Sequence, residues 1–281
     1  MLQPQDLGLT MFGSYLREPG ELAWSGGMVT LLGEFGFSTE AARAALSRLA
    51  ARGLVARVKE GRKVFYELTD RAEALLLEGD RRIFSFGDGA AASERWTVLW
   101  HSLPEEHRME RARLGSRLRF LGFGSVQDAT WVAPHDREDE VVALLESLGV
   151  ADYAYVLVGH PTKALNIRAV IDEAWDLDDV TRRYEEFRTE FEPYRRKRAR
   201  SVLDDREAFV VRTRAVHLFR GFPFLDPELP DALMPRPNLR PKVVATFHEL
   251  YDALREPAER HFEAVAGVGA ADALAGVSAA D

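Results

Sequence analysis

The sequence predicts a multidomain α+β protein, because its apolar pattern changes character three times along the chain. Residues 38–68 combine a helical period with two alternating strands. Residues 96–158 alternate strand-like and helix-like segments, and the chain becomes mainly helical from Asn166 onward. With 281 residues, the chain can form two or three domains with substantial cores. We expect these domains over residues 1–88, 94–162 and 165–265, with a flexible tail over 266–281.

The composition is that of a soluble globular protein, and the lack of cysteine fits a reducing compartment. Hydrophobic residues make up 46% and charged residues 29% of the chain, and its formal net charge is −8. The absence of cysteine excludes disulfides, thiolate metal sites and cysteine nucleophiles. The first residues, MLQPQDLGLT, do not read as a signal peptide, and no uncharged apolar run approaches the ~18 residues of a membrane helix. We therefore expect a cytoplasmic protein without a membrane partner.

The N-terminal part has the element order of a winged helix-turn-helix. Helices are predicted over 7–16 and 26–32, the second capped by Ser25. Ser38 is a good N-cap for a third helix, whose apolar face contains Ala42, Ala45, Leu46 and Leu49 and which Gly53 ends. Alternating strands follow over 54–58 and 64–68, joined by the charged loop 59–63.

Basic residues are concentrated on this segment. Between Arg43 and Tyr66 there are seven basic residues against Glu60 alone, which gives 7 − 1 = +6 on an acidic chain. A solvated helix with an exposed hairpin would also be charged, but helix, turn and basic wing together favour a double-stranded DNA partner. The third helix should enter the major groove, its N-terminus should meet phosphate, and the wing should contact the flanking backbone. The expected DNA-binding residues are Ser38, Thr39, Arg43, Ser47, Arg48, Lys59, Arg62 and Lys63.

The central part reads as a small sandwich of a sheet and helices. Another helix begins at Thr69, and the small, glycine-rich stretch 87–93 is the best candidate linker. Strands are then predicted over 96–103, 126–132 and 153–158, and helices over 105–120 and 137–148. Strand–helix–strand–helix–strand in this length predicts helices covering one face of the sheet.

The C-terminal part reads as helical, with helices over 178–191, 206–219 and 243–262. Residues 221–241 contain six prolines and should form an extended connection. Arg214, His217 and Arg220 recur at spacings of three, which places them on one side of a helix. With Trp175 they could line an effector pocket for an anionic or thioester group. The alternative is that His217 is a structural group.

A basic run occupies residues 195–200, with five positive charges in six positions. Such a run is most often a solvated face. The functional alternatives are a seat for the phosphates of a CoA-type effector and an additional contact with DNA.

A resemblance to one protein family is carried by three segments: 37–68, FGSVQDATWVAP at 123–134, and RTRAVHLFRGFPFLDPELPDALMP at 212–235. They resemble the PaaX-like bacterial transcriptional repressors, the family of the phenylacetate-degradation regulator. The resemblance implies a winged helix, a small ferredoxin-like central domain and a helical C-terminal domain. It also implies a homodimer that binds a partly palindromic operator and is released by an acyl-CoA-type effector such as phenylacetyl-CoA.

Enzymatic functions are not favoured. The chain has no HExxH spacing, no phosphate-cradling glycine loop and no GxSxG nucleophile elbow, so we expect no catalytic residues, metal site or cofactor. The central segment resembles the small CRISPR-associated endoribonuclease fold, where an acidic residue ends the first strand and holds a metal. Ser102 stands at that place, and a hydroxyl is a poor substitute for a carboxylate on Mg²⁺. A metal-dependent nuclease and an effector-free architectural DNA-binding protein remain the alternatives.

Overall fold

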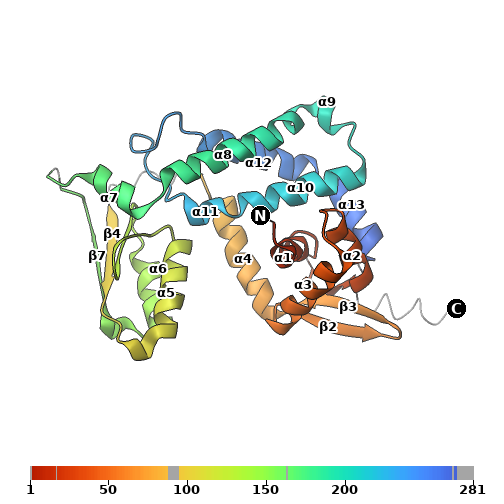
Figure 1. Cartoon of the computed structure of the whole chain (residues 1–281), viewed down its shortest axis with the longest axis horizontal. Coiled ribbons are helices and arrows are strands. Elements are labelled where there is room, and N and C mark those ends of the chain that lie inside the picture. The colour runs from red at the N-terminus through yellow and green to blue at the C-terminus, as the bar shows by residue number, and fades with distance from the viewer. Residues whose placement is uncertain (1, 17, 88–94, 163, 268, 271–281) are drawn as a thin grey trace. The chain divides into compact units, whose positions relative to one another are not determined.

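The computed structural model describes residues 2–16, 18–87, 95–162, 164–267 and 269–270 (Figure 1). The chain forms two compact units, and each is built from separated segments. The first unit comprises residues 1–84, 190–220 and 245–281, and the second comprises 85–189 and 221–244. These units group the chain differently from the three consecutive domain ranges expected above, which stay a prediction. The candidate linker at 87–93 lies almost wholly outside the described residues.

The first unit combines helices with a small antiparallel sheet. Its helices are α1 Pro4–Tyr15, α2 Ser25–Gly33, α3 Thr39–Ala51, α4 Asp70–Phe84, α9 Lys197–Arg200, α10 Asp205–Phe219 and α13 Arg255–Ala266. Its strands are β1 Glu21–Trp24, β2 Val55–Glu60, β3 Lys63–Leu68 and β8 Gly269–Ala270, in the order β2-β3-β1-β8. Helix α12, Arg240–Ala253, begins in the second unit and ends in the first.

The core of the first unit contains residues from the N-terminal helices and from α10 and α13. Leu7, Met11 and Phe12 of α1 are fully buried together with Phe209 of α10 and Phe262 of α13. Helix α2 approaches α13 so closely that a Cβ atom on Gly27 would collide with the backbone of residues 265–266. Helices α10 and α13 therefore complete the apolar environment of the N-terminal helices.

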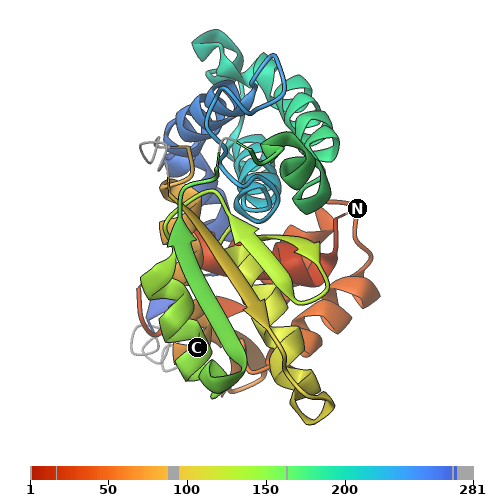
Figure 2. The same cartoon turned by 90° about the vertical axis from the view of Figure 1, so that its left-hand side faces the viewer.

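The second unit contains an antiparallel sheet in the order β5-β6-β4-β7, with β4 and β7 side by side (Figure 2). The strands are β4 Trp96–His101, β5 Gly124–Gln127, β6 Thr130–Ala133 and β7 Ala154–Gly159. Helices α5 Arg108–Phe120 and α6 Glu138–Ser147 cover one face through a core that includes Leu99, Leu114 and Leu118. On the other face, α7 Ile167–Ala174 and the segment around Leu229 and Met234 pack on Trp96 and Val132.

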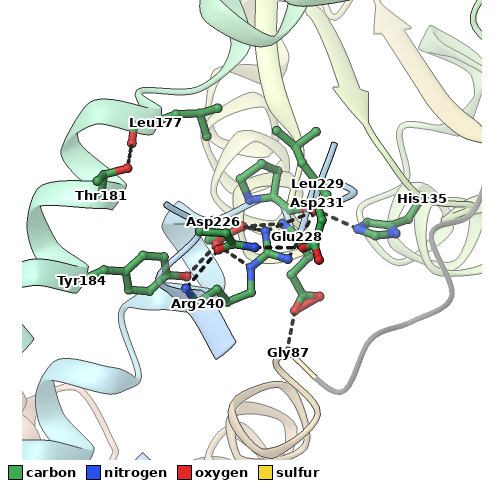
Figure 3. A network of polar contacts seen from close by, with 12 residues as sticks. Gly87, His135, Leu177, Thr181, Tyr184, Asp226, Glu228, Leu229, Asp231 and Arg240 are labelled. Carbon is green, nitrogen blue, oxygen red and sulfur yellow. Dashed lines mark hydrogen bonds and ion pairs between the residues drawn. The ribbon is translucent and has the colours of Figure 1, made fainter. Parts of the chain in front are cut away.

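A buried ion pair fixes the proline-rich segment in the second unit (Figure 3). Asp226 accepts bonds from Arg240 Nε at 2.8 Å and Nη2 at 2.9 Å, and from the Tyr184 hydroxyl of α8, Leu177–Phe191, at 2.5 Å. Burial and the Asp226 carboxylate raise the pKa of Tyr184 well above its usual value, so the hydroxyl stays protonated and donates. His135 Nε2 lies 3.0 Å from the Pro227 carbonyl oxygen. These contacts hold a segment that has little regular secondary structure.

Several element boundaries correct the sequence-based expectations. The strand expected over 126–132 is the hairpin β5–β6, which turns at Ala129 with a φ of 63°. Ser25 is the first helical residue of α2 rather than its cap, and the helix expected over 243–262 is two helices interrupted at Leu254. The strand expected over 96–103 ends at His101, and the connection 221–241 contains the short helix α11, Phe222–Leu225.

Candidate nucleic-acid interface

Helix α3 has one buried face and one exposed polar face. Ala42, Ala45, Leu46 and Leu49 are at most 1% exposed, as the helical spacing predicts. The Ser38 hydroxyl accepts a bond from the Ala41 N–H at 3.2 Å and caps the helix. The opposite face leaves four of the expected DNA-binding residues exposed to solvent: Thr39, Arg43, Ser47 and Arg48.

The other three expected DNA-binding residues lie on the β2–β3 hairpin. Its strands pair from Val55 with Leu68 to Glu60 with Lys63, so the connection is the tight turn Gly61–Arg62 rather than the longer loop 59–63. Gly61 has a φ of 57°, a backbone conformation that residues other than glycine rarely adopt. Lys59, Arg62 and Lys63 are exposed around this turn.

One side-chain contact links α3 to the hairpin, and two others link each of these elements to a neighbour. Arg57 Nη2 of β2 donates to the Ser47 hydroxyl of α3 at 3.0 Å. Arg48 Nε donates to Gln5 Oε1 of α1 at 3.1 Å, and the Lys63 ammonium lies 5.9 Å from the ring centroid of Trp24. The exposed side chains of α3 and the hairpin, together with Trp24 of β1, thus form one basic surface, which we call the α3–hairpin surface.

Two residues of this surface were not among the expected sites. Arg57 alternates with Lys59 on the exposed side of β2, so a period of two along the strand would have identified it. Trp24 is 40% exposed and belongs to β1, which pairs with β3 at Trp24 and Phe65. No local pattern connects Trp24 with Lys63, because strand pairing brings them together.

The candidate effector residues make contacts within their own units. His217 Nδ1 lies 3.0 Å from the Thr10 hydroxyl, and Arg220 Nη1 donates to the same hydroxyl at 2.7 Å. Burial, reinforced by the guanidinium groups of Arg220 and Arg214 and opposed by Asp6, lowers the pKa of His217 to about 4. His217 is therefore neutral at pH 7 and tied to α1.

The other two candidates have different partners. Arg214 pairs with Glu190 through Nε and Nη2. Trp175 follows α7 in the second unit and packs against Trp96, with ring centroids 6.3 Å apart. The structure thus brings His217 and Arg220 together on Thr10, while Arg214 is held by Glu190 and Trp175 belongs to another unit.

The basic run 195–200 is partly neutralised. Arg195 Nε and Arg200 Nη1 contact the Glu249 carboxylate of α12 at 3.3 and 2.8 Å. Arg196, Lys197 and Arg198 are exposed. The middle of the run therefore presents its charge to solvent, and the Arg195 side chain is 38% exposed beside its carboxylate partner.

Comparison with protein families matches nearly the whole chain in three parts. Residues 3–72 match the family described as PaaX-like protein, residues 89–170 match the PaaX protein central Cas2-like domain, and residues 175–264 match the PaaX-like protein C-terminal domain. The chain belongs to the PaaX-like family. This confirms the resemblance drawn from residues 37–68, 123–134 and 212–235.

Two relatives illustrate the family. The chain is 28% identical over 233 residues to the Transcriptional repressor PaaX of Escherichia coli (strain K12), covering 80% of this chain and 72% of that protein. A solved structure, the uncharacterized protein Rv0674 from Mycobacterium tuberculosis, superposes with a TM-score of 0.53 at 21% identity, covering 93% of this chain and 99% of that one. The second likeness concerns the fold alone. The similarity to the Escherichia coli protein supports the function of a transcriptional repressor. Transcriptional repressors are DNA-binding proteins and not enzymes.

The part of the chain that the structure describes contains neither a candidate membrane span nor a candidate metal-ion cluster. None of the described helices is both long and apolar enough to cross a bilayer. Among the same residues, no three His, Asp or Glu side chains are grouped so that they could hold a metal ion.

Proposed function

We propose that this protein is a dimeric repressor that binds its operator through a winged helix formed by α1–α3 and the β2–β3 hairpin. The observation that carries the proposal is the α3–hairpin surface, where an exposed helix face and a basic hairpin are joined by the Arg57–Ser47 bond. A helix of this kind fits the major groove, where arginine can pair with guanine O6 and N7. Arg43 and Ser47 are the proposed base-reading residues, with Arg48 beside them.

The remaining residues of the surface are assigned to the DNA backbone. Ser38 and Thr39 lie at the start of α3, where unpaired N–H groups and the helix dipole favour a phosphate. Lys59, Arg62 and Lys63 surround the hairpin turn and would contact phosphates or the minor groove beside the site. A dimer would present two such surfaces to half-sites about one helical turn of DNA, or a multiple of it, apart.

We further propose release by an acyl-CoA-type effector such as phenylacetyl-CoA, which the family resemblance implies. Arg214, His217, Arg220 and Trp175 stay the proposed effector residues. An anionic group on the effector would compete with Glu190 for Arg214 and with Thr10 for Arg220. Because Thr10 belongs to α1, which packs in the same core as α3, loss of that contact gives a physical route from effector to DNA. Release requires that the effector bind the DNA-free arrangement more tightly.

The test is a binding titration against DNA from the region upstream of the protein's own gene, at fixed salt, with and without phenylacetyl-CoA. Specific binding that the thioester abolishes would support the repressor and its effector together. Specific binding that phenylacetyl-CoA and other acyl-CoAs leave unchanged would reject the effector and keep the repressor. Equal affinity for this DNA and for scrambled DNA would favour an architectural DNA-binding protein. Sedimentation of the protein–DNA complex would decide whether a dimer binds.

A further inference from the structure

A cavity of about 610 Å³ lies in the Cas2-like part of the second unit, on the side of the sheet that faces α5. Its walls come from the end of β4, from α5 and from the β5–β6 hairpin, and include His101, Arg111, Arg119, Asp128 and Trp131. This volume is in the range of small-molecule sites. None of the proposed DNA-binding or effector residues lines it.

The cavity has a cationic wall on α5. Arg111 and Arg119 are eight residues apart, which corresponds to about 12 Å along the helix. Arg111 is engaged, because its Nη2 donates to the carbonyl oxygens of Leu103 and Pro104 at 2.6 and 3.1 Å. Its Nη1 also lies 3.4 Å from the Glu105 carboxylate, which offsets part of its charge. Arg119 is exposed, lies 5.1 Å from the centroid of the Trp131 ring, and makes a long bond of 3.4 Å to the Gly115 carbonyl. Arg119 is therefore the cation that an incoming anion can recruit.

Two further wall groups have unused hydrogen-bonding capacity. Trp131 is 8% exposed, and its indole Nε1–H has no partner among the described residues. The same holds for Nδ1 of His101, whose pKa is lowered by burial and by the Arg111 guanidinium. Leaving such a donor unpaired in the interior costs about 1–3 kcal/mol. The Arg119 guanidinium lies over the indole ring, so movement of Arg119 toward a ligand would also expose more of Trp131.

The opposite wall is shaped by a strained turn. Ala129 has a φ of 63°, and its carbonyl oxygen accepts the His101 N–H at 3.0 Å, which ties the hairpin tip to the end of β4. A non-glycine residue in this conformation costs of order 1–3 kcal/mol, and such residues cluster at functional sites. The neighbouring Asp128 carboxylate lines the cavity and offers an acceptor to a hydroxyl or amino group.

We propose that this cavity binds a phosphorylated small molecule that also carries hydroxyl groups. The phosphate bonds Arg119, with Arg111 adding positive potential and the Trp131 Nε1–H donating to a phosphate oxygen. Asp128 accepts from a hydroxyl of the same ligand. A phosphate group suits this site because guanidinium pairs bidentately with its oxygens. Binding of such a ligand at the cavity does not require that the ligand change the affinity for DNA.

The experiment is isothermal titration of the full-length protein with ribose 5-phosphate, with inorganic phosphate and with ribose. We expect ribose 5-phosphate to bind and ribose not to bind. The exchange Arg119→Gln should weaken binding about tenfold, the value of one lost charge-assisted bond. The matched control Arg113→Gln changes an exposed arginine of the same helix that does not line the cavity, and should leave the dissociation constant unchanged.

A second variant tests the indole. Trp131→Phe keeps an aromatic ring and removes the Nε1–H, and it should also weaken ribose 5-phosphate binding, provided that its circular dichroism matches the parent. Equal affinity for inorganic phosphate and ribose 5-phosphate would overturn the hydroxyl contact with Asp128 and reduce the site to a seat for free phosphate. The proposal is overturned if neither phosphate compound binds up to about 10 mM, if ribose binds equally well, or if Arg119→Gln and Arg113→Gln bind alike.

Discussion

Replacing Asp226 by alanine should destabilise the protein strongly, because this carboxylate accepts hydrogen bonds from the side chains of Arg240 and Tyr184 (Figure 3). Its side chain is 0% exposed and that of Arg240 is 10% exposed. Asp226 Oδ1 also accepts the Glu228 N–H at 2.6 Å. The substitution leaves a buried guanidinium, the Tyr184 hydroxyl and a backbone N–H without their acceptor.

The magnitude follows from burial. Removing one partner of a buried ion pair costs about 3–5 kcal/mol, since the remaining charge has lost both water and its counter-ion. In a chain of this size such a loss lowers the melting temperature by about 10 °C. Urea denaturation followed by circular dichroism measures the free energy of unfolding, and calorimetry measures the melting temperature.

The chain offers a matched control in an exposed pair of the same geometry. Asp205 accepts bonds from Arg260 Nε at 2.9 Å and Nη2 at 2.7 Å, but the two side chains are 43% and 58% exposed. Asp205→Ala should cost at most about 1 kcal/mol, because water screens and replaces that pair. Equal losses in the Asp226 and Asp205 variants would refute the argument from burial.

Four further predictions concern DNA binding, the hairpin turn and pH. Arg43→Ala should weaken operator binding by about 1–3 kcal/mol while changing non-specific binding less, and competition titrations showing the reverse would reject base contact. Lys63→Ala should lower affinity for all sequences and reduce the salt slope by about one, whereas an unchanged slope would exclude a phosphate contact. Ala129→Gly should raise the free energy of unfolding by about 1 kcal/mol, because glycine adopts the left-handed conformation without strain. The control Ala112→Gly in α5 should lower the free energy of unfolding by a similar amount. A lower free energy of unfolding in both variants would contradict the strain at Ala129. The folded pKa of His217, about 4, lies below its unfolded value, so the unfolded chain binds the extra proton as the pH falls. The free energy of unfolding should therefore decline by up to about 3 kcal/mol from about pH 6.5 to about pH 4. Urea titrations in which His217→Gln leaves that decline unchanged would contradict this prediction.

Local patterns predicted what depends on local spacing. The buried face of α3 follows from the apolar period alone, and the same period places Arg43 and Ser47 on the exposed face. The hairpin strands followed from alternation, although the loop was shorter than expected. The interruption at Leu254 had an available signal in Pro257, which a helix tolerates only near its first turn.

Other features depend on contacts that no local pattern contains. Strand β1 is four residues long and exists through its pairing with β3, so it carries too few positions for a clear period. Ala129 adopts a conformation that sequence reasoning assigns to glycine or asparagine. The Trp24–Lys63 contact and the Asp226–Arg240 pair arise only when separated segments meet. The Trp24–Lys63 and Asp226–Arg240 contacts stayed hidden because they are nonlocal, whereas Arg57 had a local signal in the period of two along β2.

The shared core of the first unit has a consequence during protein synthesis. Phe209, Ala258, Phe262 and Ala266 are buried with the N-terminal helices. At about 5–20 residues per second, the ribosome adds this last turn of α13 roughly 10–40 s after it has finished α4. Until then, helices α1–α3 lack part of the surface that buries their apolar faces. Truncated chains released from the ribosome before residue 255 lack α13 and therefore cannot complete this core.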